Sequence, residues 1–160
     1  MTSILHALDH ALGAVLGWLA WLVVPVVVLL FLQWPLRDLI QAYSREANDL
    51  GQWIFALFMA AAVTAATRER IHLAADSFAQ RYPPRVRAVL ARLGALLGLV
   101  PWALFLLYAS RQSVWMSLRQ LESFPDTYNP GYFMIKLALW VLAGLLLLQA
   151  LVDAFRPRPA

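Results

Sequence analysis

The residues best suited to binding a metal ion are the histidines, of which the chain has three. His6 and His10 lie four residues apart, so a helix would present both rings on one face at a spacing that can bind a metal. No third ligand lies near them, and the chain has no cysteine that could supply a thiolate. An isolated histidine pair is more often solvated polar surface, so we predict no metal site.

His72 and Asp76 form a second pair at the same spacing, after Arg68 and Arg70. In a structural interpretation this pair fixes the start of a helix at the edge of a membrane. In a functional interpretation it belongs to a docking or ion-sensitive site. Haem in a helical bundle would need histidines that face each other between helices. None of the histidines lies within the membrane spans predicted below, so we predict no cofactor.

The sequence also lacks the residue arrangements that are typical of enzyme sites. It shows no nucleophile beside a general base, no paired carboxylates and no glycine-rich phosphate loop. We therefore expect no catalytic residue and predict that the protein is not an enzyme.

The elements that carry these residues are strongly apolar. Of the 160 residues, 62% are hydrophobic and 14% are charged, against roughly 45–50% and 25% in soluble domains. Four stretches contain no Asp, Glu, Lys or Arg, and each approaches the roughly 20 residues that cross a bilayer. We predict an all-α integral membrane protein with one membrane domain, 1–160. Its four transmembrane helices are expected at about 12–36, 50–67, 93–110 and 132–152.

These spans offer no route for an ion. An ionisable residue inside the membrane usually marks a proton relay or an ion pathway, and the four charge-free stretches contain none. We therefore expect that this chain does not transport a substrate alone.

Two segments between the spans have amphipathic patterns. Residues 36–49 repeat apolar side chains at three- and four-residue steps, which favours an interfacial helix on the membrane surface; a solvated helix packed on the spans is the alternative. The loop 68–92 holds six arginines and is divided at Tyr82-Pro83-Pro84 into two short helical segments.

Small residues predict close helix contacts. The span 50–67 begins near Trp53 and is rich in alanine, including Ala61 and Ala65. Small side chains let helices approach closely in lipid. We expect this span to be a contact helix, within the bundle or against a partner. Two GxxxG patterns, in 13–17 and 94–98, permit similar contacts.

The basic residues predict the orientation of the chain. Eight of the 13 Lys and Arg residues lie in the loop 68–92 and the C-terminal tail, on one side of the predicted membrane. Basic loops favour the cytoplasm, so both termini are expected there. The net charge of +4 is therefore attributed to the orientation of the chain in the membrane, and it does not indicate a nucleic-acid partner. No cleavable signal peptide is evident, so the first span is expected to stay in the mature protein.

Three short motifs, taken together, resemble the DctQ-type small membrane subunits of tripartite ATP-independent periplasmic (TRAP) transporters. The first is Arg68-Glu69-Arg70-Ile71-His72-Leu73-Ala74-Ala75-Asp76, followed by Tyr82-Pro83-Pro84-Arg85-Val86-Arg87. The second is the helical loop with Glu46, Asp49 and Trp53 before the alanine-rich span. The third is Asn129-Pro130-Gly131-Tyr132-Phe133 at the start of the last span, with Gln149 near its end. The resemblance covers about 30–155.

The resemblance implies a small, non-catalytic scaffold subunit in the inner membrane of a bacterial cell. Such a subunit pairs with a large DctM-type permease, which carries the sodium and substrate sites and moves as an elevator. A DctP-type periplasmic binding protein delivers an organic acid, typically a carboxylate. Membrane lipids are the remaining partner. The alternatives are a stand-alone four-span assembly or regulatory protein and, third, a redox membrane anchor.

The resemblance also suggests roles for individual residues. Arg68, Arg70, His72 and Asp76 would order the cytoplasmic loop and contact the large subunit. Trp53, Ala61 and Ala65 would pack in the subunit interface. Arg37, Arg45 and Arg119 would meet acidic groups on the binding protein, with ordinary solvated arginines as the alternative.

Overall fold

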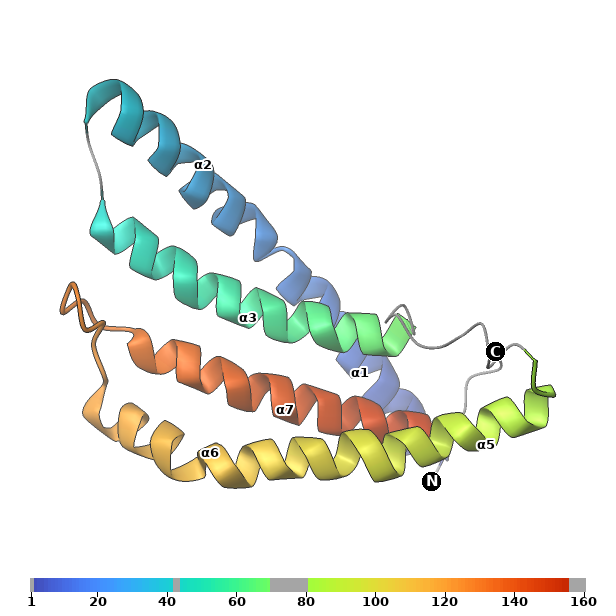
Figure 1. Cartoon of the computed structure of the whole chain (residues 1–160). Coiled ribbons are helices and arrows are strands. Elements are labelled where there is room, and N and C mark those ends of the chain that lie inside the picture. The colour runs from blue at the N-terminus through green and yellow to red at the C-terminus, as the bar shows by residue number, and fades with distance from the viewer. Residues whose placement is uncertain (1, 42–43, 70–80, 156–160) are drawn as a thin grey trace.

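The computed structural model describes the chain except for residues 1, 42–43, 70–80 and 156–160. The described residues form helices and no strand (Figure 1). The helices are α1 (Thr2–Ala20), α2 (Val23–Ile40), α3 (Arg45–Glu69), α5 (Pro84–Gly94), the π-helical turn η1 (Ala95–Leu99), α6 (Val100–Gln120) and α7 (Tyr132–Phe155).

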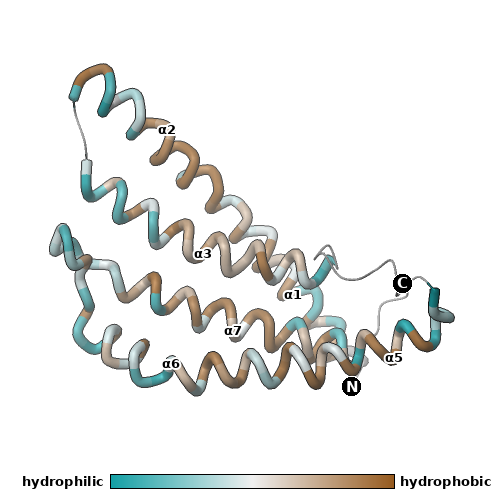
Figure 2. The backbone as a smooth tube through the Cα atoms, viewed as in Figure 1, coloured by the Kyte–Doolittle hydropathy of each residue, from teal (hydrophilic) through white to brown (hydrophobic). Residues whose placement is uncertain are grey.

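Four of the described helical segments are long and apolar enough to cross a membrane. They are Ile4–Ile40, Arg45–Glu69, Pro84–Gln120 and Tyr132–Phe155. Figure 2 shows apolar residues in brown through the middle of α2 and α3 and hydrophilic residues in teal at their outer ends. The prediction of an all-α membrane protein with four spans is confirmed. The segments extend beyond the charge-free stretches because each helix continues into its polar flanks.

The first span is bent between α1 and α2, and Pro25 accounts for the bend. Proline has no N–H to donate to the carbonyl four residues earlier, here that of Trp21, and its ring crowds that carbonyl. The chain tightens instead, with the N–H groups of Trp21 and Leu22 donating to the carbonyl oxygens of Trp18 and Leu19 at 3.2 and 3.1 Å. Beyond the bend, α2 diverges from α3 (Figure 1).

The segment 36–49 does not form the single interfacial helix that its pattern suggests. Helix α2 ends at Ile40, and Gln41 has a left-handed backbone with φ of 55°. Helix α3 then starts anew at Arg45, where the Ser44 hydroxyl accepts a hydrogen bond from the Ala47 N–H at 3.1 Å. The apolar positions before and after this break therefore belong to two different helices.

Helices α5, η1 and α6 form one long rod. The Val100 N–H donates to the carbonyl of Ala95, five residues earlier, which defines the π-helical turn. Pro101 follows directly, and we attribute the wider turn to its missing N–H and bulky ring. The predicted span 93–110 lies in the middle of this rod, and the second helical segment expected in the loop 68–92 is α5.

Helices α3 and α7 form the centre of the bundle. Helix α7 packs against α3 on one side and α6 on the other, while α1 crosses the end of α3 and α7 (Figure 1). Buried Leu12, Leu16 and Ala61 form a core cluster, with Leu19, Ala65 and Leu145 packed against it. Trp140 also joins α7 to α6, because its indole N–H donates to the Ser110 hydroxyl at 3.0 Å. The core is therefore shared by α1, α3 and α7.

Candidate functional site

A buried polar cluster joins α1, α3 and α7 at one end of the bundle. An Arg68 guanidinium nitrogen lies 2.5 Å from a carboxylate oxygen of Asp9 and donates to the Gln149 side-chain oxygen at 3.4 Å. Asp9 is 9% exposed, and Gln149 is fully buried. Three residues far apart in the sequence thus bring three helices to one point.

The Asp9–Arg68 ion pair reduces the free-energy cost of placing each charge at low dielectric. An unpaired charge in low dielectric is expensive, whereas a hydrogen-bonded ion pair offsets much of that cost. Gly13 provides space for the arginine, since a Cβ atom built there would lie 3.3 Å from an Arg68 guanidinium nitrogen. The first GxxxG pattern therefore accommodates an arginine side chain, and the other glycine of that pattern, Gly17, has nothing within 4 Å of the equivalent point.

Asp9 is the residue that the sequence analysis missed. The predicted first span begins at about residue 12, but the structure places Asp9 inside α1 and within the span Ile4–Ile40. Its position relative to Leu12 and Leu16, three and seven residues later, was the available signal. Those spacings put a carboxylate on the buried face of an apolar helix, where a basic partner is required.

A second polar cluster lies at the opposite end of α3. Asp49 is buried, and one of its carboxylate oxygens accepts hydrogen bonds from the Thr127 hydroxyl at 2.5 Å and the Asn129 side-chain amide at 2.9 Å. Asp49 therefore fastens the start of α3 to the loop between α6 and α7. Asp49 belongs to the second of the sequence motifs, but nothing in the sequence identifies Thr127 and Asn129 as its partners.

The loop that Asp49 holds has a defined backbone. The Phe124 N–H donates to the Asn129 carbonyl and the Tyr128 N–H to the Phe124 carbonyl, both at 2.8 Å. Gly131 has φ of 124°, a conformation that L side chains rarely adopt. Half-buried Trp53 lies against this glycine, with indole atoms 3.7 and 3.8 Å from the point where a Cβ would be.

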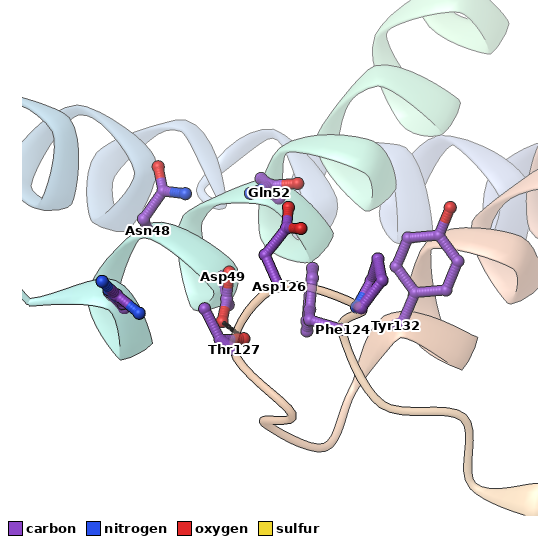
Figure 3. Close-up of a pocket in the computed structure, with 9 residues that line it drawn as sticks. Asn48, Asp49, Gln52, Phe124, Asp126, Thr127 and Tyr132 are labelled. Atoms are coloured by element: carbon purple, nitrogen blue, oxygen red, sulfur yellow. Dashed lines mark hydrogen bonds between the residues drawn. The ribbon is translucent and has the colours of Figure 1, made fainter.

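An open cleft of about 410 Å³ adjoins this cluster (Figure 3). Its walls come from the first turns of α3 and from the loop before α7, and they carry side chains of both charges. The lining residues are Arg45, Asn48, Asp49, Gln52, Phe124, Pro125, Asp126, Thr127 and Tyr132. Within the described part of the chain, no group of three or more His, Asp and Glu residues could hold a metal ion. The cleft can therefore offer hydrogen bonds and charges to a partner surface.

Glu122 ties the end of α6 to the start of α7. One carboxylate oxygen lies 2.5 Å from the Lys136 ammonium group and accepts a hydrogen bond from the Ser117 hydroxyl, also at 2.5 Å. The hydrogen bond from Lys136, and then that from Ser117, holds the pKa of Glu122 below its usual range. The Glu122 carboxylate is therefore ionised at neutral pH. Its contacts with Ser117 and Lys136, here called the Glu122 clasp, hold the end of α6 to the start of α7.

The alanine face of α3 packs within the chain. Ala61 is buried against Leu12 and Leu16 of α1, and Ala65 packs beside them. The resemblance implies that Ala61 and Ala65 pack in a subunit interface; within the chain Ala61 is buried and Ala65 is partly buried. Trp53 likewise contacts the loop of its own chain at Gly131.

The charged residues and the histidine that were predicted to contact partners lie in different parts of the molecule. Arg68 belongs to the buried cluster, whereas Arg70, His72 and Asp76 lie outside the described residues. Arg37 is exposed and pairs with its neighbour Asp38 at 3.0 Å. Arg45 lines the cleft, and Arg119 lies over the Trp115 ring at 5.5 Å from its centre. Of those that the structure describes, it brings only Arg45 to the cleft.

One known family matches most of the chain. The family described as "Tripartite ATP-independent periplasmic transporters, DctQ component" matches residues 26–159. No curated protein and no solved structure matches the chain. Helix α1, with Asp9, lies outside the matched range.

Removing one partner of the Asp9–Arg68 pair should destabilise the bundle more than removing both. We expect Asp9→Leu or Arg68→Met to cost on the order of 3 kcal/mol, because each removes the ion-pair partner of a charge that lies at low dielectric. The double variant should cost less than either single variant, and therefore less than the sum of the two. The measurement is a double-mutant cycle on unfolding in detergent micelles.

Arg37→Met is the matched control, since it breaks an exposed pair with Asp38 and should cost less than about 1 kcal/mol. Strict additivity of the two cluster substitutions would show that Asp9 and Arg68 do not interact in the folded chain.

The clasp at Glu122 should weaken in acid. Since the folded-state pKa of Glu122 is below its unfolded value, its stabilisation is complete above the unfolded pKa and is lost as pH falls through the folded pKa. We expect Lys136→Met and Glu122→Gln to reduce the loss of thermal stability between neutral pH and about pH 3. A pH profile in both variants that is identical to that of the wild type would contradict this role.

Proposed function

Because the chain belongs to the DctQ component family of tripartite ATP-independent periplasmic transporters, we propose that it is the non-catalytic scaffold subunit of a sodium-coupled transporter for organic acids. In this proposal a large elevator-type permease carries the substrate and sodium sites. A periplasmic binding protein delivers a carboxylate substrate. The family match over residues 26–159 is the observation on which this conclusion rests.

The bundle has the construction that a fixed scaffold requires. Its polar side chains join helices to one another at both ends of α3, through Asp9–Arg68–Gln149 and through Asp49 with the loop before α7. An elevator moves against a partner that must itself hold its shape. Fastening at both ends of a central helix favours this role.

Helix α2 is the surface that we assign to the large subunit. Val26 is the single buried residue among its described side chains, whereas Val27, Val28 and Phe31 are exposed. Helix α6, by contrast, has a packed face that includes Ala103, Val114 and Ser117. Because α2 makes so few contacts inside its own chain, most of its apolar surface is left to contact a second protein.

The cleft end of the bundle is the surface that we assign to the binding protein. Arg45 lines the cleft there, and Arg37 and Arg119 lie near the ends of α2 and α6 at the same end of the molecule. These arginines would meet acidic groups of the binding protein. The assignment places the cleft in the periplasm and both termini in the cytoplasm of a bacterial cell, as the distribution of basic residues favours.

Purification from the native membrane tests the proposal. The affinity-tagged chain should bring down a much larger polytopic permease in a fixed ratio, identified by mass. Phe31→Ala should weaken this recovery, because Phe31 lies on the proposed contact helix. Recovery of the chain alone, folded and monodisperse, would favour the stand-alone four-span protein instead.

Phe105→Ala on α6 is the matched control, since Phe105 and Phe31 are equally exposed, at 64% and 65%. If both substitutions weaken recovery equally, α2 is not the specific contact.

Cysteine labelling tests the orientation, and the natural chain has no cysteine to interfere. Tyr128→Cys places a thiol in the exposed loop beside the cleft, and Ala91→Cys places one on exposed α5 at the other end. A membrane-impermeant maleimide should label Tyr128→Cys in cells with a permeable outer membrane and an intact inner membrane. Ala91→Cys should react only after the inner membrane is opened, and the reverse pattern would invert the topology.

A further inference from the structure

Helix α5 carries arginines on both edges of an exposed apolar stripe. The stripe consists of Val86, Val89, Leu90 and Leu93, which recur at the three- and four-residue steps of one helix face. Successive residues turn by about 100° around a helix. Arg85 and Arg92 therefore lie along one edge of the stripe and Arg87 along the other. This arrangement lets guanidinium groups reach lipid headgroups while the stripe contacts acyl chains.

The positive charge of α5 is not balanced locally. The segment 81–95 contains no acidic residue. Within the described part of the chain, no carboxylate pairs with Arg85, Arg87 or Arg92. At the other end of the molecule, Arg37 pairs with Asp38 and Arg119 lies over the Trp115 ring. The charge of α5 is therefore available to an anionic ligand.

Helix α5 lies where the rod leaves the membrane. The segment Pro84–Gln120 has 37 residues, about 55 Å of helix, whereas the hydrocarbon core is about 30 Å thick. Figure 1 shows α5 projecting past the ends of α3 and α7. The charge-free stretch 93–110 begins directly after Arg92, so α5 is at headgroup level.

The described part of the chain leaves the stripe uncovered. Helix α5 has no buried residue, and its least exposed residues, Arg87 and Ala88, lie away from the centre of the stripe. Exposed Tyr82, just before the helix, adds an aromatic ring of the kind that is enriched at membrane interfaces. Together, the apolar stripe, the arginines beside it and the aromatic ring have the chemistry that a membrane interface requires.

We propose that α5 is a binding site for anionic phospholipids. The stripe lies between the headgroups and the acyl chains, and Arg85, Arg87 and Arg92 bind lipid phosphate groups through their paired N–H donors. The net negative charge of the lipid supplies the selectivity, because in a zwitterionic headgroup the ammonium group offsets the attraction of the phosphate for the arginines. The site belongs to this chain alone and does not depend on a partner subunit.

Lipid titration of the purified full chain tests the charge requirement. In a neutral detergent, native mass spectrometry should show tighter binding of phosphatidylglycerol than of phosphatidylcholine. The triple variant Arg85→Gln/Arg87→Gln/Arg92→Gln should bind phosphatidylglycerol about tenfold more weakly or worse, with a smaller loss of phosphatidylcholine binding. None of the three side chains contributes to the buried core, so the variant should fold.

The matched control Arg37→Gln/Arg45→Gln/Arg119→Gln removes the same charge at the other end of the molecule and should keep the preference for phosphatidylglycerol. Wild-type affinity in the α5 variant would overturn the proposal. An equal loss in both triple variants would also overturn it, because net charge alone would then explain the binding.

Cysteine labelling in vesicles tests the placement of the stripe. Val89 and Ala91 are both exposed in the chain, and two helical steps separate them by about 200°. In vesicles of phosphatidylcholine and phosphatidylglycerol, a water-soluble maleimide should react several-fold faster with Ala91→Cys than with Val89→Cys. Equal rates would show that lipid does not cover the stripe, and would point to a protein partner instead.

Discussion

A polar group inside a bilayer has no water to bind, and this constraint decides where the helices of this chain are held together. Apolar burial gives little drive to helix association in lipid, because acyl chains are as apolar as leucine. Specific polar contacts therefore carry unusual weight. Here they lie at the two ends of α3, where Arg68 meets Asp9 and Gln149, and Asp49 meets Thr127 and Asn129. Between them these contacts hold α1, α7 and the loop before α7 to one central helix.

The packing between the two clusters depends on small side chains. Ala60 and Ala61 of α3, and Ala143 and Ala150 of α7, are buried where the two helices meet their neighbours. Buried Thr64 does not add a polar contact between helices, because its hydroxyl donates to the Ala60 carbonyl of its own helix at 2.8 Å. When the helices approach closely, the Arg68 side chain has a shorter distance to span to Asp9 and Gln149. The small residues and the polar clusters thus depend on each other.

The parts of this fold that the sequence predicts are those set by local composition. Charge-free stretches predict four spans because hydrocarbon accepts no charge that lacks a partner, whatever the tertiary contacts. The Asp9–Arg68 pair depends on which helices pack against each other, and local sequence patterns do not predict helix pairing. Ala61 shows the same limit, since its size predicts a close contact but not that α1, rather than a partner, makes it. Gln41, with its left-handed backbone, divides a segment whose periodicity alone is continuous.

The same constraint distinguishes α2 from the other spans. Among the described residues, no hydrogen bond or ion pair joins a side chain of α2 to another helix, since Arg37 pairs only with its neighbour Asp38. A side-chain amide nitrogen of Gln33 is buried without a hydrogen-bond partner in the described part of the chain. If polar contacts are what fix a helix in lipid, α2 is the span that this chain fixes least. Its apolar surface and the Gln33 amide are therefore where a second protein would add the contacts that α2 lacks, which is why we assign this helix to the large subunit.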